Sequence, residues 1–241
     1  MFRQNNSPHN NQLYLCAPIN ALVEGIYEQK IPFTEIKQRG DFGLGTFDHL
    51  DGEMVMLNGD IFQIDSHGRV TREPDTALTP FAAVTFYNPL THDQLDKPAT
   101  YQEFSNWLYE LLPSLNIFYA IRIYGVFSYI KTRSVPKQEC YRPLVQVTKT
   151  QPVFEFENVR GTLAGFFTPS FMGAVSVPGM HLHFLSDDLQ HGGHLLECRP
   201  RQIDAGIQFL HSVEIGLPFS LEYLTADFQR DVEQDLRKAE K

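Results

Sequence analysis

The segment of residues 177–198, VPGMHLHFLSDDLQHGGHLLEC, most constrains the fold, because it holds four of the nine histidines of the chain. Residues two apart on a strand point to the same face, so His181 and His183 share one face of a predicted strand. Serine, aspartate and glycine residues follow, and the extended pattern resumes at His194. The segment therefore predicts a β-hairpin with a long loop.

The register of this hairpin predicts that three histidines converge. With its centre between Asp188 and Leu189, His183 and His194 lie equally far from the turn and face each other, with His181 on the diagonal. Three neutral imidazoles leave a fourth coordination position open to water or substrate, as in catalytic zinc sites. We therefore predict that His181, His183 and His194 bind one Zn2+.

Two alternatives to this interpretation stay open. His191 lies in the glycine-containing loop and is the second choice for the third ligand, because the direction of a loop side chain is less fixed. An HxH pair also occurs on polar strand faces that bind no metal, and the histidines then have no catalytic role. The third histidine in cross-strand register favours the metal site over this second alternative.

Strand patterns dominate the rest of the chain. Residues 54–64, MVMLNGDIFQI, surround Asn58-Gly59 with two apolar arms and predict a type I′ hairpin. Residues 116–133 predict two strands that are separated at Gly125. Six further strands are predicted over residues 144–148, 153–157, 162–167, 174–185, 193–199 and 203–215. The predicted fold class is α+β, with mixed, strand-rich sheets and two main helices.

Different sequence patterns predict the two main helices. Apolar residues at helical spacing predict one amphipathic helix over residues 17–30. Thr100 and Glu103 form a capping-box pattern that predicts the second helix, which ends before Pro113. Each helix accompanies a run of strands, so a loose duplication of two β-rich halves is an alternative reading, although no sequence repeat supports it.

The domain prediction is a disordered head over residues 1–12 and one domain over residues 13–241. Its two β-rich halves, roughly 13–115 and 116–241, are expected to share one core, because no Pro- and Ser-rich linker divides them. The charged stretch from Thr225 to Lys241 predicts a short helix or an ordered tail.

Charge and hydropathy exclude several kinds of partner. The chain has 29 acidic and 20 basic residues, a formal net charge of -9, and its basic residues are scattered, so nucleic acid is not an expected partner. No apolar run approaches the length of a membrane span, and the polar N-terminus does not match a secretory signal. We therefore expect a cytoplasmic protein that binds no membrane.

Two sequence blocks resemble the acetolactate decarboxylase family: GDFGLGTFDHLDGEMVMLNGDIFQ, residues 40–63, and the segment of residues 161–198 that ends in the histidine hairpin. The resemblance implies that His181, His183 and His194 are the zinc ligands of that family. It also implies site roles for Thr46 in GTF, Glu53 in LDGE and Arg133. A glutamate of the C-terminal tail matches Glu240, or else Glu233. Ser176 departs from the family pattern, in which asparagine precedes VPG.

The resemblance implies decarboxylation of 2-acetolactate to acetoin and carbon dioxide, in which zinc acts as a Lewis acid and stabilises the enediolate. It implies that Arg133 orients the substrate, that Glu53 or Glu240 delivers the proton, and that the chain is a homodimer. Without the resemblance, two other functions fit the histidines. One is a zinc hydrolase with Glu53 as the base, and the other is a non-catalytic metal-binding β-module.

Overall fold

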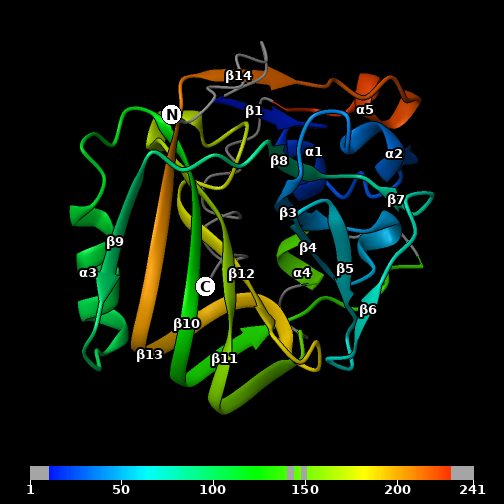
Figure 1. The fold of residues 1–241 in the computed structure, drawn as a ribbon. Helices are drawn as coiled ribbons and strands as arrows, with labels where there is room; N and C mark the ends of the chain where they lie inside the picture. Colours follow the sequence, from blue (N-terminus) through cyan, green and yellow to red (C-terminus); the bar gives the residue numbers. More distant parts are fainter. Residues whose placement is uncertain (1–10, 140–143, 148–150, 229–241) are drawn as a thin grey trace.

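The computed structural model describes residues 11–139, 144–147 and 151–228. Two large sheets lie side by side, and few short helices accompany them (Figure 1). This arrangement confirms the predicted strand-rich α+β fold class. Within the described ranges, no helix has the length and apolar character needed to span a membrane.

The first sheet has seven short strands in the order β14-β1-β8-β3-β4-β5-β6. Their bounds are Ser212–Ile215 for β14, Gln12–Leu15 for β1, Ala82–Thr85 for β8, Phe42–Thr46 for β3, Glu53–Leu57 for β4, Asp60–Ile64 for β5 and Val70–Arg72 for β6. The pairing of β1 with β14 is parallel, and the other pairings are antiparallel.

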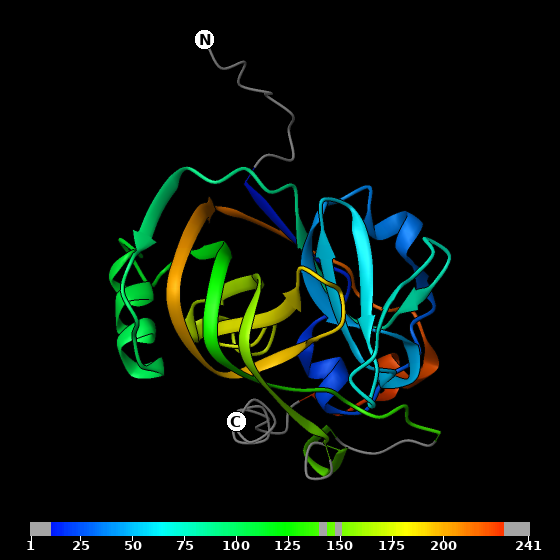
Figure 2. The same cartoon turned by 60° about the horizontal axis from the view of Figure 1, so that its bottom comes forward.

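The second sheet has five strands in the order β10-β11-β12-β13-β9, and β10 also pairs with β13. Their bounds are Phe118–Arg133 for β10, Val153–Thr168 for β11, Gly179–Ser186 for β12, Gly192–Leu210 for β13 and Thr91–Leu95 for β9. Because β10 pairs with both β11 and β13, and β12 joins these two, the four strands close a ring of pairings. Figure 2 shows how strongly they curve.

The small elements surround these two sheets. A separate two-stranded sheet pairs β2, Ile31–Pro32, with β7, Leu78–Thr79. The helices are α1 (Ile19–Val23), α2 (Phe33–Ile36), α3 (Tyr101–Glu110), α4 (Leu144–Val147) and α5 (Leu221–Thr225). Two 3-10 turns are η1 (Asp48–Leu50) and η3 (Ser170–Met172).

Two local predictions are confirmed. Asn58 and Gly59, with φ of 52° and 81°, connect β4 to β5, as the type I′ hairpin requires. The hydroxyl of Thr100 accepts a hydrogen bond from the backbone N–H of Glu103, whose carboxylate accepts one from the N–H of Thr100, so a capping box begins α3.

The predicted break at Gly125 is wrong, because β10 runs without interruption through it. Gly125 pairs with Gly161 on β11 and with Ile203 on β13. A Cβ atom at Gly125 would lie 2.2 Å from the carbonyl oxygen of Gln202. The glycine therefore lets three backbones approach closely. A glycine inside a strand can mark such a close approach instead of a break in the strand.

Two further predictions are wrong in type or length. The helix predicted over residues 17–30 is shortened to α1, because Gly25 has a φ of 85°, outside the helical region, and residues 26–30 have no regular secondary structure. Residues 144–148 were predicted as a strand, but Leu144 and Val147 form α4. Both side chains are buried in one core cluster, as the i, i+3 spacing of a helical turn allows.

The other strand predictions are correct in type and wrong in extent. The two strands predicted over residues 153–167 are one strand, β11, and β13 continues through the gap predicted between residues 199 and 203. The strand predicted from residue 174 begins only at Gly179, after η3. Residues 1–10 of the predicted head and 229–241 of the predicted tail lie outside the described residues.

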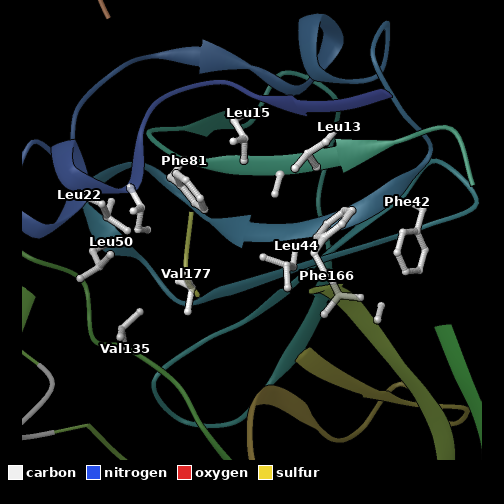
Figure 3. Close-up of a cluster of buried hydrophobic side chains, with 14 of the residues drawn as sticks. Leu13, Leu15, Leu22, Phe42, Leu44, Leu50, Phe81, Val135, Phe166 and Val177 are labelled. Carbon is white, nitrogen blue, oxygen red and sulfur yellow. The ribbon is translucent and has the colours of Figure 1, made fainter. Parts of the chain in front are cut away.

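The main hydrophobic core lies between the two sheets. It brings Leu13 and Leu44 of the seven-stranded sheet together with Phe166 and Leu185 of the five-stranded sheet. Figure 3 shows that this cluster extends to Leu22, Leu50, Phe81 and Val135, which lie together at one end. A second cluster lies between the five-stranded sheet and α3. The candidate site lies where the first cluster meets the histidine hairpin.

Candidate metal centre

The histidine hairpin has the predicted register. His183 on β12 and His194 on β13 are paired residues, and the two strands are joined by residues 187–191. One ring nitrogen from each of His181, His183 and His194 lies within 4.8 Å of the others. The shortest separation, between Nε2 of His181 and Nδ1 of His194, is 3.2 Å. The three imidazoles therefore converge closely enough to share one ion.

His191 does not join this cluster. Its ring stacks on Phe156, with 4.3 Å between the centroids, and it does not line the cavity that the other three histidines line. Its contact with an aromatic ring on β11 accounts for its position. The alternative in which His191 replaces His194 therefore has no geometric support.

The orientation of His183 fits a metal ligand. Its Nδ1 lies 2.9 Å from the carbonyl oxygen of Met54, and a carbonyl can only accept, so Nδ1 carries the hydrogen. Nε2 is then left with a lone pair, is fully buried, and has no hydrogen-bond partner among the described residues. Metal-bound histidines characteristically donate their second N–H to a carbonyl or carboxylate in this way.

The electrostatic environment keeps the three imidazoles neutral. Burial, followed by the nearby charge of Arg133, lowers the pKa of His181 to about 3. Burial is also the main reason that the pKa values of His183 and His194 lie well below the usual range. Because a metal binds the unprotonated ring, none of the three must lose a proton to bind one at neutral pH.

Arg133 lies beside the histidines because of the register of the five-stranded sheet. It ends β10, where it is paired with His194 on one side and with Val153 on the other. Its Nη2 lies 3.2 Å from Nε2 of His194, and its Nη1 donates to Oε1 of Gln151 at 2.9 Å. The side chain lines the cavity and is buried. Its charge therefore acts on the cavity in a low-dielectric environment.

Thr46 and Glu53 reach the site from the other sheet. They are paired residues of β3 and β4, and both are buried. Oε2 of Glu53 lies 3.5 Å from Nε2 of His183. The hydroxyl of Thr46 donates to the carbonyl of Gly52 at 2.6 Å, which fixes the turn immediately before Glu53. The two predicted residues therefore lie at the cluster, on the side opposite the hairpin.

The residues converge on a cavity of about 50 Å³. Its polar lining is the histidines together with Thr46, Glu53, Arg133 and Gln151. Its apolar lining is Ile19, Leu22, Leu50, Phe81, Val135 and Leu144. Sequence reasoning missed Gln151 and this apolar wall, because no local motif marks them and each reaches the site through the tertiary fold.

Three residues named from the sequence are not among the residues that line this cavity in the described part of the chain. Glu233 and Glu240 are outside the described residues. Ser176 does not line the cavity, and its hydroxyl accepts a hydrogen bond from Thr168 at 3.2 Å. The departure from the family pattern at Ser176 is therefore not in direct contact with the candidate ligands.

The fold and the cavity define a strand-rich protein with a small candidate metal site of three histidines. The family model described as alpha-acetolactate decarboxylase matches residues 13–230. The chain therefore belongs to the alpha-acetolactate decarboxylase family, which confirms the resemblance seen in the two sequence blocks.

Named relatives support the same assignment. The alpha-acetolactate decarboxylase of Methanosarcina mazei is 41% identical over 230 residues, covering 95% of this chain and 80% of that protein. The enzyme of Bacillus subtilis is 36% identical over 229 residues, covering 92% and 90%. A crystal structure of the Bacillus subtilis enzyme superimposes with a TM-score of 0.92 at 34% identity and covers 95% of this chain and 99% of that one.

Proposed function

We propose that this chain decarboxylates 2-acetolactate to acetoin and carbon dioxide with one zinc ion held by His181, His183 and His194. The observation that carries the proposal is the convergence of three neutral ring nitrogens within 4.8 Å in a small buried cavity of a decarboxylase-family chain. Neutral imidazoles suit zinc, and His181, His183 and His194 would hold the ion. When bound, the ion supplies Lewis-acid stabilisation of the charge that develops on the substrate.

Residues of the chain carry out substrate binding and proton transfer. Arg133 binds the substrate carboxylate with a planar, permanently charged donor group. The bond between the carboxylate carbon and C2 then breaks, carbon dioxide leaves, and the electron pair stays on the substrate. Glu53 delivers a proton to C2 from its position near His183, with Glu240 as the second candidate donor. Thr46 holds the turn that presents Glu53.

The wider organisation is part of the same proposal. We propose one domain after residue 12, because one core cluster contains side chains from both sheets. We also propose that the chain forms a homodimer and is cytoplasmic. Light scattering would measure the mass of the dimer. Elution of the purified chain at monomer mass over a wide concentration range would contradict the dimer.

Two measurements test the catalytic proposal. Protein without a histidine tag should contain about one equivalent of zinc, and the zinc-loaded protein should convert 2-acetolactate to acetoin with release of carbon dioxide. A zinc hydrolase would form no acetoin. A non-catalytic metal-binding β-module would form none either, and would unfold on metal removal. Zinc well below one equivalent, with full activity, would remove the metal from the proposal.

A further inference from the structure

The turn between Thr46 and Glu53 has a strained backbone at the wall of the cavity. His49 and Leu50 are consecutive residues with φ of 62° and 57°. Two left-handed residues in a row are usual for an Asn-Gly pair, whereas a positive φ is an outlier for a bulky side chain such as leucine. Leu50 is also 2% exposed and lines the cavity. Strain of this kind, between two candidate site residues, indicates a functional constraint on Leu50.

Hydrogen bonds on both sides of Leu50 hold the turn in this conformation. Before Leu50, the backbone N–H of His49 donates to the carbonyl of Tyr27 at 2.9 Å. After it, the N–H of Gly52 donates to the carbonyls of Leu50 and Val135, both at 3.1 Å. The surrounding structure therefore fixes the backbone of Leu50 against its strain, and it keeps the side chain at the cavity.

The chemistry of the substrate gives the apolar wall a role. The oxygen atoms of 2-acetolactate belong to a carboxylate, a hydroxyl and a ketone, and its methyl groups are its apolar parts. In a small cavity the polar lining takes the oxygen atoms, so the methyl groups face the apolar lining, which includes Leu50. We propose that Leu50, held in a strained conformation, is a specificity-determining residue that limits the size of the alkyl groups of the substrate. The inference rests on the proposed function and deepens it.

Leu50 differs from the other apolar residues of the wall in its backbone. Ile19, Leu22 and Leu144 lie on the short helices α1 and α4, and among the six apolar residues that line the described cavity only Leu50 has a positive φ. The cavity of about 50 Å³ is small, so an added methylene must displace a wall side chain. The hydrogen bonds of the turn oppose a shift of Leu50. A pocket that cannot yield discriminates against one methylene by about 10- to 200-fold.

Release of carbon dioxide from three acids tests the proposal. They are 2-acetolactate, its homologue with an ethyl group in place of the methyl group on C2, and its homologue with a propionyl group in place of the acetyl group. Wild type should prefer 2-acetolactate over at least one homologue by about 10-fold or more in kcat/KM. Leu50→Ala should reduce this ratio to below about threefold, because the shorter side chain leaves room for the added methylene. The ratio does not depend on the fraction of the protein that holds metal.

Leu50→Gly tests the strain separately from the side chain. Glycine adopts a positive φ without a steric penalty, whereas alanine keeps the Cβ atom that causes the strain. Both variants should show the same change in the substrate ratio, but the thermal midpoint of Leu50→Gly should lie about 2–4 °C above that of Leu50→Ala. A lower midpoint of Leu50→Gly would contradict the strain at Leu50. If Leu50→Ala does not fold, Leu50→Gly supplies the substrate ratio.

Leu108→Ala is the matched control. Leu108 is 1% exposed on α3, packs in the second core cluster and does not line the cavity. Its truncation should lower the thermal midpoint and leave the substrate ratio within about twofold of wild type. The same change of ratio in Leu108→Ala, or an unchanged ratio in the Leu50 variants, would overturn the inference, as would equal kcat/KM of wild type for the three acids. Wild type that forms no acetoin would instead contradict the proposed function.

Discussion

The two sheets supply the candidate site in different ways. The five-stranded sheet has strands of up to 19 residues and brings three histidines and Arg133 together through pairings between neighbouring strands. The seven-stranded sheet has strands of at most five residues and supplies Thr46 and Glu53 from one hairpin. Strand register within one sheet places the candidate metal ligands, whereas packing between the two sheets places Glu53, the candidate proton donor.

His183 is the residue at which the two arrangements meet. Its Nδ1 bonds the carbonyl of Met54 on β4, and its Nε2 faces Glu53 on the same strand. The seven-stranded sheet therefore sets the tautomer of a candidate ligand on the five-stranded sheet. One side chain, His183, therefore connects the candidate metal ligands with the candidate proton donor Glu53, and substitutions in each sheet test the two separately.

The largest effect is expected from the five-stranded sheet. His194→Ala removes one of the three candidate ligands, and activity should fall by about 10⁴-fold because Lewis-acid stabilisation is lost. Zinc content should fall with it, measured by elemental analysis, while circular dichroism stays close to wild type. His191→Ala is the matched control, since His191 packs on Phe156 and not at the cavity. Equal losses in both variants would contradict the assignment of the ligands.

The seven-stranded sheet should contribute a second, smaller effect. Glu53→Gln keeps the size of the side chain and removes its ability to deliver a proton, so kcat should fall by roughly 10³-fold. Zinc content should remain near wild type, which separates this defect from that of His194→Ala. Glu155→Gln is the control, because Glu155 is exposed and pairs with Lys131 at 3.5 Å. Full activity of Glu53→Gln would assign proton delivery to another acid.

The five-stranded sheet should also make the metal-free protein sensitive to acid. The pKa values of His183 and His194 are lowered by burial, so the unfolded chain takes up protons near pH 6.5 and the folded chain does not. The free energy of unfolding is therefore unaffected above pH 6.5 and falls as the pH decreases below it. The loss should approach about 1.4 kcal/mol per pH unit for each of these two residues and, because its pKa is lowered to about 3, for His181 as well.

Urea unfolding of metal-free protein between pH 7.5 and 5 measures this slope. His183→Asn should show a smaller slope than wild type, since one buried titrating ring is removed. Zinc-loaded protein should resist acid until the metal dissociates, because the ion competes with protons for the same nitrogens. A free energy of unfolding that stays constant from pH 7 to 5 would contradict the neutral, buried state of these rings.

Contacts between residues close in the sequence could be predicted from the sequence, whereas contacts between distant strands could not. His183 and His194 are eleven residues apart, and the turn between them fixes their pairing, so the alternation of side chains was enough to bring the three histidines together. The capping box of α3 is similarly local. By contrast, Thr46, Glu53 and Arg133 were named through the family resemblance, because their approach depends on distant strands.

The errors have the same physical origin. Gly125 was read as a strand break, but its role is to admit the backbone of β13, more than seventy residues further along the chain. The helix predicted over residues 17–30 has correct apolar spacing but ends before Gly25, where the backbone leaves the helical region. Gln151 carries no local signal and becomes visible only when β11 is aligned with β10.

The smallest effect is expected from the turn of the seven-stranded sheet. Thr46→Val replaces the hydroxyl by a methyl group of similar size, so the buried carbonyl of Gly52 loses the 2.6 Å hydrogen bond from Thr46. The free energy of unfolding should fall by about 1–2 kcal/mol, measured by urea unfolding. Because Gly52 precedes Glu53, kcat should fall several-fold, with the zinc content unchanged. Thr46→Ser keeps the donor and should restore kcat; a matching loss in both variants would mean that the methyl group of Thr46, and not its hydrogen bond, supports Glu53.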